Sequence, residues 1–250
     1  MDLYTSFSLI QYLCIAVLFV WVGFVRSGLG FGGAALGLPL LLFVHNQAIF
    51  WMPVIGLHLL FFSALTLRTR IHKVDTVYLK KSCFWIMPFT LLGIAGLITL
   101  PTSWLLSFIY GVALLYSLLW LLDRSVKSKN AWFDYLLLMI GGYVAGTSLT
   151  GAPLIAAVFM RNVSAELLRN TLFVLWFVIV SLKLAVFLVL GIELHMLFAI
   201  ALLPIAAVGH FIGLKTHDFI LQNAQLFRRV IGGVLALVSV LGLVNVWVIT

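Results

Sequence analysis

Ten stretches of apolar residues follow one another along this chain and take up most of its 250 residues. They run at about 8–25, 31–44, 48–67, 82–100, 103–122, 132–146, 150–160, 168–190, 194–213 and 229–248. A helix needs ~20 mainly apolar residues to cross the ~30 Å hydrocarbon core of a bilayer. Only 9% of the residues are charged, whereas about a quarter are charged in a soluble domain. We therefore expect an all-α integral membrane protein with about eight to ten transmembrane segments, embedded in the lipid bilayer.

Most basic residues lie in the connections after the third, fifth, seventh and ninth runs. They are Arg68, Arg70, Lys73, Lys80 and Lys81, then Arg124, Lys127 and Lys129, then Arg161 and Arg169, and finally Lys215, Arg228 and Arg229. The connections near 45–48, 100–102 and 191–194 contain no Lys or Arg. Since Lys and Arg gather in cytoplasmic loops, this alternation predicts ten segments with both termini periplasmic. The same bias explains the net charge of +8, so we expect no nucleic-acid partner.

A weak internal repeat divides the chain into residues 1–125 and 126–250. Glycines and prolines coincide at a displacement of 114 residues (Gly28 with Gly142, Gly32 with Gly146, Gly37 with Gly151, Pro39 with Pro153) and of 116 residues (Pro88 with Pro204, Gly93 with Gly209). Each half contains five segments, so the second half enters the membrane from the opposite side. The sequence therefore predicts two five-segment repeats of inverted topology, an architecture common among secondary transporters.

Glycine-rich breaks interrupt both repeats at corresponding places. The second, sixth and seventh runs are only about 11–15 residues long, which leaves open whether they span the membrane or re-enter it. Exposed N–H groups at the start of a broken helix attract anions, and glycine lets a bound group approach the backbone. The alternative is that these glycines only pack helices closely. The predicted substrate-binding residues are Ser27, Gly28, Gly30, Gly32 and Gly33 in the first break, and Gly146, Thr147, Ser148, Thr150 and Gly151 in the second.

Four ionisable residues within or beside the apolar runs are further candidates, because charge is costly at membrane depth. Lys183 is predicted to balance a bound anion, or alternatively to reach the outer interface. Arg26, beside the first break, is either a site residue or an interfacial anchor. His58 and His210 are candidates for coupling to a proton or an anion, or they bond to a neighbouring carbonyl. No Asp or Glu lies well inside a run, which favours an anionic substrate.

Enzyme chemistry finds no support in the sequence. The chain has no paired carboxylates, no HExxH motif and no Cys–His constellation, so we expect neither catalytic residues, nor a metal site, nor a cofactor. The remaining alternatives to a transporter are an anion channel and a non-transporting membrane scaffold of the same fold. Homo-oligomerisation stays open.

The glycine motifs resemble those of the TauE/SafE sulfite exporter family. The resemblance rests on Gly28-Leu29-Gly30-Phe31-Gly32-Gly33 followed by Leu38-Pro39, on the echo from Gly146 to Pro153, and on Gly232-Gly233 near the C-terminus. It covers essentially the whole chain, although the second break is less rich in glycine. It implies export of sulfite, sulfonates or related organosulfur anions across a bacterial inner membrane, driven by the proton gradient. No role is inherited for Lys183, His58 or His210.

Overall fold

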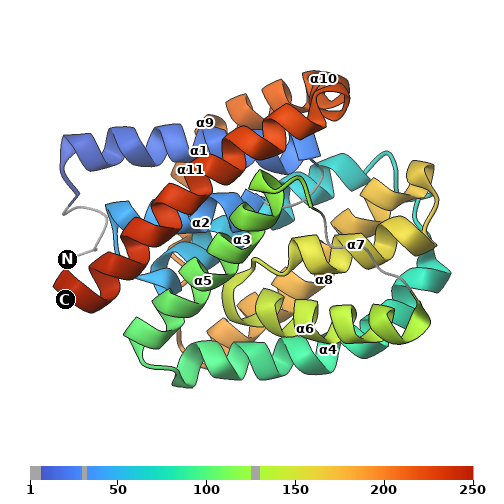
Figure 1. The fold of residues 1–250 in the computed structure, drawn as a ribbon, viewed down its shortest axis with the longest axis horizontal. Coiled ribbons are helices and arrows are strands. Elements are labelled where there is room, and N and C mark those ends of the chain that lie inside the picture. Colours follow the sequence, from blue (N-terminus) through green and yellow to red (C-terminus); the bar gives the residue numbers. More distant parts are fainter. Residues whose placement is uncertain (1–6, 30–32, 125–129, 250) are drawn as a thin grey trace.

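The fold is built from helices joined by short connections (Figure 1). A computed structural model describes residues 7–29, 33–124 and 130–249, and no strand occurs in these ranges. The helices are α1 (Leu9–Leu29), α2 (Gly33–Val44), α3 (Ala48–Leu67), α4 (Thr76–Thr99), α5 (Thr102–Leu121), α6 (Ala131–Ser148), α7 (Ala152–Asn162), α8 (Ala165–Val189), α9 (Met196–Lys215), α10 (His217–Gln222) and α11 (Ala224–Val244).

Each predicted apolar run corresponds to one helix, and α10 is an additional short helix that the runs did not indicate. Seven helices in the described part of the chain are long and apolar enough to cross a membrane. The helices outside this set are the six-residue α10 and also α2, α6 and α7, the segments predicted to be short. α6 is longer than predicted. It has 18 residues, because the helix continues past the glycine at which its apolar run ends.

At the end of the molecule where most basic residues lie, several helices extend beyond their apolar runs. α4 begins at Thr76, where the Asp75 carboxylate accepts a hydrogen bond from the Tyr78 N–H at 2.8 Å, an N-terminal cap. Lys80, Lys81 and Arg169 therefore lie within helices. Figure 1 shows the ends of α3, α7 and α9 and the starts of α4, α8 and α11 at one end of the molecule. That this end faces the cytoplasm stays a prediction.

Two helical hairpins enter the molecule from opposite ends (Figure 1). In the α1–α2 hairpin the Gln11 side chain donates to the Val44 carbonyl at 3.1 Å, which joins the start of α1 to the end of α2. In the α6–α7 hairpin Arg161 forms an ion pair with the buried Asp134 at 3.0 Å, which joins the start of α6 to the end of α7. Each hairpin therefore begins and ends on the same side.

Each hairpin packs closely on a helix from the other half of the chain, α1 on α9 and α6 on α4. A Cβ atom on Gly209 of α9 would collide with the Val20 carbonyl of α1, and one on Gly93 of α4 would collide with the Tyr143 carbonyl of α6. Such close backbone approach is available only to glycine. The two glycines are 116 residues apart, and their partners Val20 and Tyr143 are 123 residues apart.

Glycine contacts of the same kind occur a second time between these helix pairs. Gly23 of α1 meets the Ala206 carbonyl as Gly146 of α6 meets the Thr90 carbonyl, again at displacements of 123 and 116 residues. The displacement of 114 residues instead aligned Gly32 with Gly146. It differs because glycine serves both helix breaks and close helix packing, and the two uses look alike in sequence.

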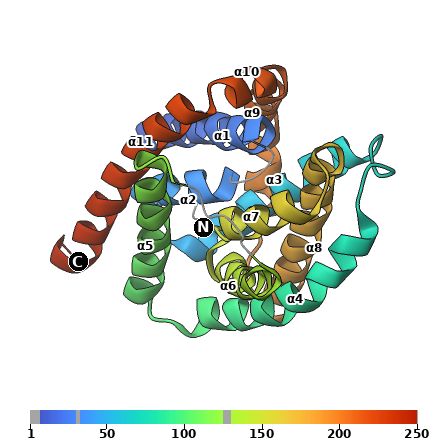
Figure 2. The ribbon, with the colours of Figure 1, turned by 45° about the vertical axis from the view of Figure 1, so that its right-hand side comes forward.

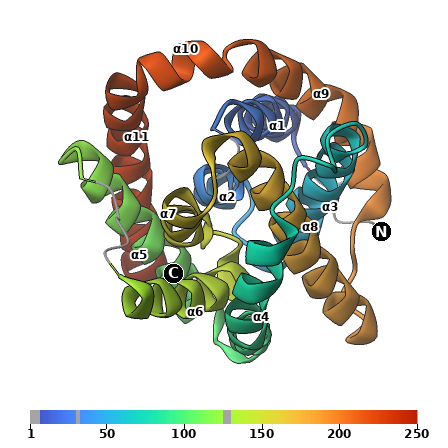
Figure 3. The ribbon, with the colours of Figure 1, turned by 90° about the vertical axis from the view of Figure 1, so that its right-hand side faces the viewer.

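The short helices α2 and α7 lie in the interior, with longer helices around them (Figure 3). α5 and α11 lie side by side at one edge of the molecule (Figure 2). Large apolar side chains such as Phe19 and Trp51 are fully buried in the core. Many other large apolar side chains, especially on α9 and α11, are exposed, as expected for surfaces that face lipid.

Candidate functional site

A small cavity lies where the first turns of α2 and α7 meet. Gly33 and Ala34 of α2 and Ala152 of α7 line it, and α1, α3, α6 and α8 supply the remaining walls. Its volume, measured as the space open to the centre of a water molecule, is about 30 Å³. This leaves room for about two waters or a small ion. Its lining residues are Val22, Arg26, Gly33, Ala34, Ile55, Leu59, Ser63, Ala145, Leu149, Ala152, Phe173, Trp176, Ile179 and Val180.

Arg26 supplies the positive charge of this cavity. Its side chain is on α1, three residues before the end of that helix, and only 6% of the residue is exposed. Nη1 donates to the His58 carbonyl at 3.2 Å, and the guanidinium carbon lies 4.3 Å from the centre of the Phe62 ring. Nη2 has no hydrogen-bond partner in the described part of the chain. A buried guanidinium with an unused donor is a place where an anion would be stabilised.

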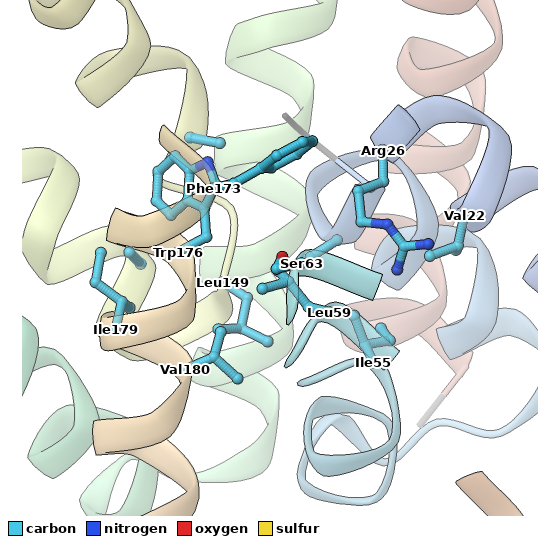
Figure 4. Close-up of a pocket in the computed structure, with 14 residues that line it drawn as sticks. Val22, Arg26, Ile55, Leu59, Ser63, Leu149, Phe173, Trp176, Ile179 and Val180 are labelled. Atoms are coloured by element: carbon cyan, nitrogen blue, oxygen red, sulfur yellow. The ribbon is translucent and has the colours of Figure 1, made fainter. Parts of the chain in front are cut away.

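Two further polar groups line the cavity without a partner among the described residues, the Ser63 hydroxyl and the Trp176 indole N–H. Figure 4 shows Arg26 and Trp176 on opposite sides of the cavity, with Ser63 between them. Ser63 and Trp176 are both buried. The sequence prediction missed them because each looks like an ordinary member of an apolar run. The only signal in the sequence was a polar indole or hydroxyl group in the middle of an apolar run. Many residues of this kind have hydrogen-bond partners and line no cavity, so the signal is weak.

The break between α6 and α7 brings the start of α7 to the cavity. Leu149 adopts a left-handed conformation with a φ of 59°, which ends α6. Gly151 immediately precedes α7, and a Cβ atom there would collide with the Gly141 carbonyl and lie 2.7 Å from the Ala145 nitrogen. The close approach of the turn to α6 therefore requires glycine at position 151. The N–H groups at the start of α7 have no partner within the helix and carry positive partial charge.

The four hydroxyl groups predicted to bind substrate form hydrogen bonds within the protein. The Thr147 hydroxyl lies 2.9 Å from the Tyr143 carbonyl and 3.1 Å from the Gly93 carbonyl. Ser148 and Thr150 are hydrogen-bonded to each other at 2.6 Å, and Ser27 is bonded to His210 Nδ1. None of the four lines the cavity.

The predicted glycines divide between the cavity and helix packing. Gly33 lines the cavity, and a Cβ atom there would lie 2.9 Å from the Arg26 Cβ, so α2 starts directly against the Arg26 side chain. Gly28 faces Ile220 of α10, and Gly146 faces α4. The last two predicted glycines, at 30 and 32, lie outside the described residues.

The other ionisable candidates surround the cavity without lining it. The Lys183 ammonium donates to the Gly146 carbonyl at 2.7 Å, so it contacts the end of α6. His58 Nε2 donates to the Ala199 carbonyl at 2.7 Å, the alternative considered for a buried histidine. The His210 ring lies 4.7 Å from the Phe62 ring, the ring on which the Arg26 guanidinium rests.

Comparison with known proteins identifies the family. The family model described as Sulfite exporter TauE/SafE matches residues 15–241, a range that includes the α6–α7 hairpin, most of the α1–α2 hairpin and the cavity. No curated protein and no solved structure matches the chain. The match agrees with the resemblance of the glycine motifs and with the seven helices able to cross a membrane. The chain is a multi-pass membrane protein that belongs to the TauE/SafE sulfite exporter family, a family of membrane transporters.

Proposed function

We propose that this protein is a secondary active transporter that exports small organosulfur anions such as sulfite and sulfonates, and that it binds them in the cavity beside Arg26. The observation that carries this proposal is the unpartnered Nη2 of a buried arginine in a cavity lined by the starts of two helices. The family supports the substrate class and the direction.

A small oxyanion would accept hydrogen bonds from the donors in the cavity that have no partner among the described residues. Its oxygens accept from Arg26 Nη2 and from the Ser63 hydroxyl or the Trp176 indole N–H, all three of which are donors without a partner among the described residues. Its charge offsets that of the guanidinium, which reduces the cost of burying either alone. The first turns of α2 and α7 add positive partial charge from two directions.

Alternating access follows from two inverted repeats, residues 1–125 and 126–250. The matching contacts of α1 with α9 and of α6 with α4 support such a pseudo-two-fold relation, because glycines at related positions make them. Each hairpin is held at its open end by a side chain, so it can move as one body. Rocking of the two hairpin units about the cavity would expose the anion to one side and then to the other.

Proton coupling is the last part of the proposal. His210 is bonded to Ser27, the residue next to Arg26, and its ring packs on the ring that carries the guanidinium. His58 presents its backbone carbonyl to Arg26. An anion at Arg26 lowers the local positive potential and so favours a proton on a nearby imidazole. Proton and anion binding then assist one another, as reciprocal linkage requires.

Counterflow of radiolabelled sulfite in proteoliposomes tests the transport function. We expect saturable uptake by the wild type, loss of uptake in Arg26→Gln, and partial uptake in Arg26→Lys, which keeps the charge but loses the planar fork. Arg68→Gln, at an exposed position after α3, is the matched control and should transport normally. Normal uptake by Arg26→Gln would exclude the cavity as the site. A non-saturating, voltage-driven current would instead establish a channel.

Substrate class is tested by thermal stabilisation of the purified protein. The panel contains sulfite, methanesulfonate, acetate and inorganic phosphate at equal concentration. We expect sulfite and the sulfonate to raise the unfolding temperature, because ligand bound only to the folded state stabilises it by mass action. Stabilisation by acetate or phosphate alone would contradict the organosulfur assignment.

A further inference from the structure

Each helix break creates an electrostatic problem for an anion site. α1 ends at Leu29 just before α2 starts at Gly33, and α6 ends at Ser148 just before α7 starts at Ala152. The start of a helix carries roughly half a positive charge, and the end of a helix roughly half a negative charge. A break therefore brings both signs to the same place, and the two largely cancel unless the helix end is neutralised.

Lys183 of α8 lies on the end of α6. Its ammonium is 2.7 Å from the Gly146 carbonyl and 3.4 Å from the Thr147 carbonyl, two of the last four carbonyls of that helix, which have no N–H partner within it. The residue is 1% exposed. Ala145 and Leu149, on either side of these carbonyls, line the cavity. The negative end of α6 thus borders the cavity, and the ammonium sits directly on it.

Arg169 of the same helix lies on the end of α1. Its Nη2 donates to the Ser27 carbonyl at 3.1 Å, again one of the last four carbonyls of a broken helix. Ser27 directly follows Arg26 in the sequence. Arg169 and Lys183 are fourteen residues apart on α8, about 21 Å along a helix axis. One helix therefore delivers a cation to the interior end of each hairpin's first helix.

We infer that α8 makes the cavity selective for anions by neutralising the negative ends of α1 and α6 with Arg169 and Lys183. The positive starts of α2 and α7 then act on the cavity without an opposing field. Both cations are positioning residues, because they bond to backbone carbonyls and not to the substrate. The inference rests on the proposed function and assigns the source of its charge selectivity. It replaces the direct contact between Lys183 and the anion that the sequence suggested.

Substitutions at Lys183 separate charge from packing and from hydrogen bonding. Lys183→Met keeps the length of the side chain but loses the charge and the donor, Lys183→Gln keeps a donor without charge, and Lys183→Arg keeps both. Sulfite binding to purified protein is measured by titration calorimetry, and sulfite transport by initial rates in proteoliposomes. Lys215→Met, at an exposed position at the end of α9, is the control.

We expect Lys183→Met and Lys183→Gln to weaken sulfite binding about tenfold, with KM raised to the same extent and the maximal rate within about twofold. Lys183→Arg and Lys215→Met should bind within about twofold of the wild type. Arg169→Gln, at the partly exposed end of α8, should lose about threefold, and this variant carries the test if both uncharged Lys183 variants fail to fold.

The inference would be overturned by wild-type affinity in the variants that lack the charge, by equal losses of affinity in Lys183→Arg and Lys183→Met, or by wild-type affinity in Lys183→Gln alone. A fall in maximal rate with unchanged KM would also contradict it, because that pattern belongs to a damaged fold or a slower conformational step. Absence of sulfite binding to the wild type would refute the proposed function itself. Binding that is equal in all variants would refute only the role of α8.

Discussion

Replacing Arg26 by methionine asks whether this residue is present for stability or for substrate. An arginine at membrane depth costs about 2.5–3.5 kcal/mol on insertion scales. Its hydrogen bond to the His58 carbonyl returns about 1.5–3 kcal/mol, and its contact with Phe62 about 0.5–2 kcal/mol. The three contributions nearly cancel. We therefore expect Arg26→Met to unfold within about 4 °C of the wild type, at about 2–4 °C per kcal/mol for a chain of this size.

The assay is thermal unfolding in detergent, followed by tryptophan fluorescence with and without sulfite. In the absence of sulfite the two proteins should be alike, and sulfite should stabilise only the wild type. A structural anchor would behave differently, because losing both contacts without relief from burial costs about 2–5 kcal/mol. A fall of more than about 10 °C in Arg26→Met without ligand would therefore refute the view that the buried charge is retained for an anion.

Two other perturbations follow from the geometry of the break and from a histidine outside the membrane segments. Gly151→Ala should abolish sulfite uptake because its Cβ would collide with the Gly141 carbonyl, whereas Gly111→Ala, with no atom within 4 Å of the new Cβ, should transport normally; uptake by the first variant would show that the break tolerates displacement. Burial lowers the pKa of His45 below 6.5, and nearby His195 lowers it further. The unfolded chain therefore binds a proton at His45 more readily than the folded chain does, and stability falls as pH drops below about 6.5. Thermal unfolding at pH 7.5 and pH 5 should therefore show a smaller decrease in His45→Gln than in the wild type, and equal decreases would contradict the assignment.

Much of the fold could be predicted because its signals are local. Apolar runs long enough to cross a bilayer mark the helices, and basic connections mark one end of the molecule. Helix ends were less accurate: α4 starts before its apolar run, where the Asp75 cap and the basic residues allow the helix to continue into the interface. Glycines such as Gly146 pack against another helix, and the sequence pattern alone does not separate this use of glycine from a helix break.

By itself the sequence determined that the chain is a membrane protein and approximately where its apolar helices lie. Those properties depend on neighbouring residues along the chain. The tertiary structure alone decided that Ser63 and Trp176 share a cavity with Arg26, and that Lys183 contacts the end of α6 and not the cavity. Where a buried side chain points depends on which helices pack against it, and those contacts join residues far apart in sequence that no local pattern relates.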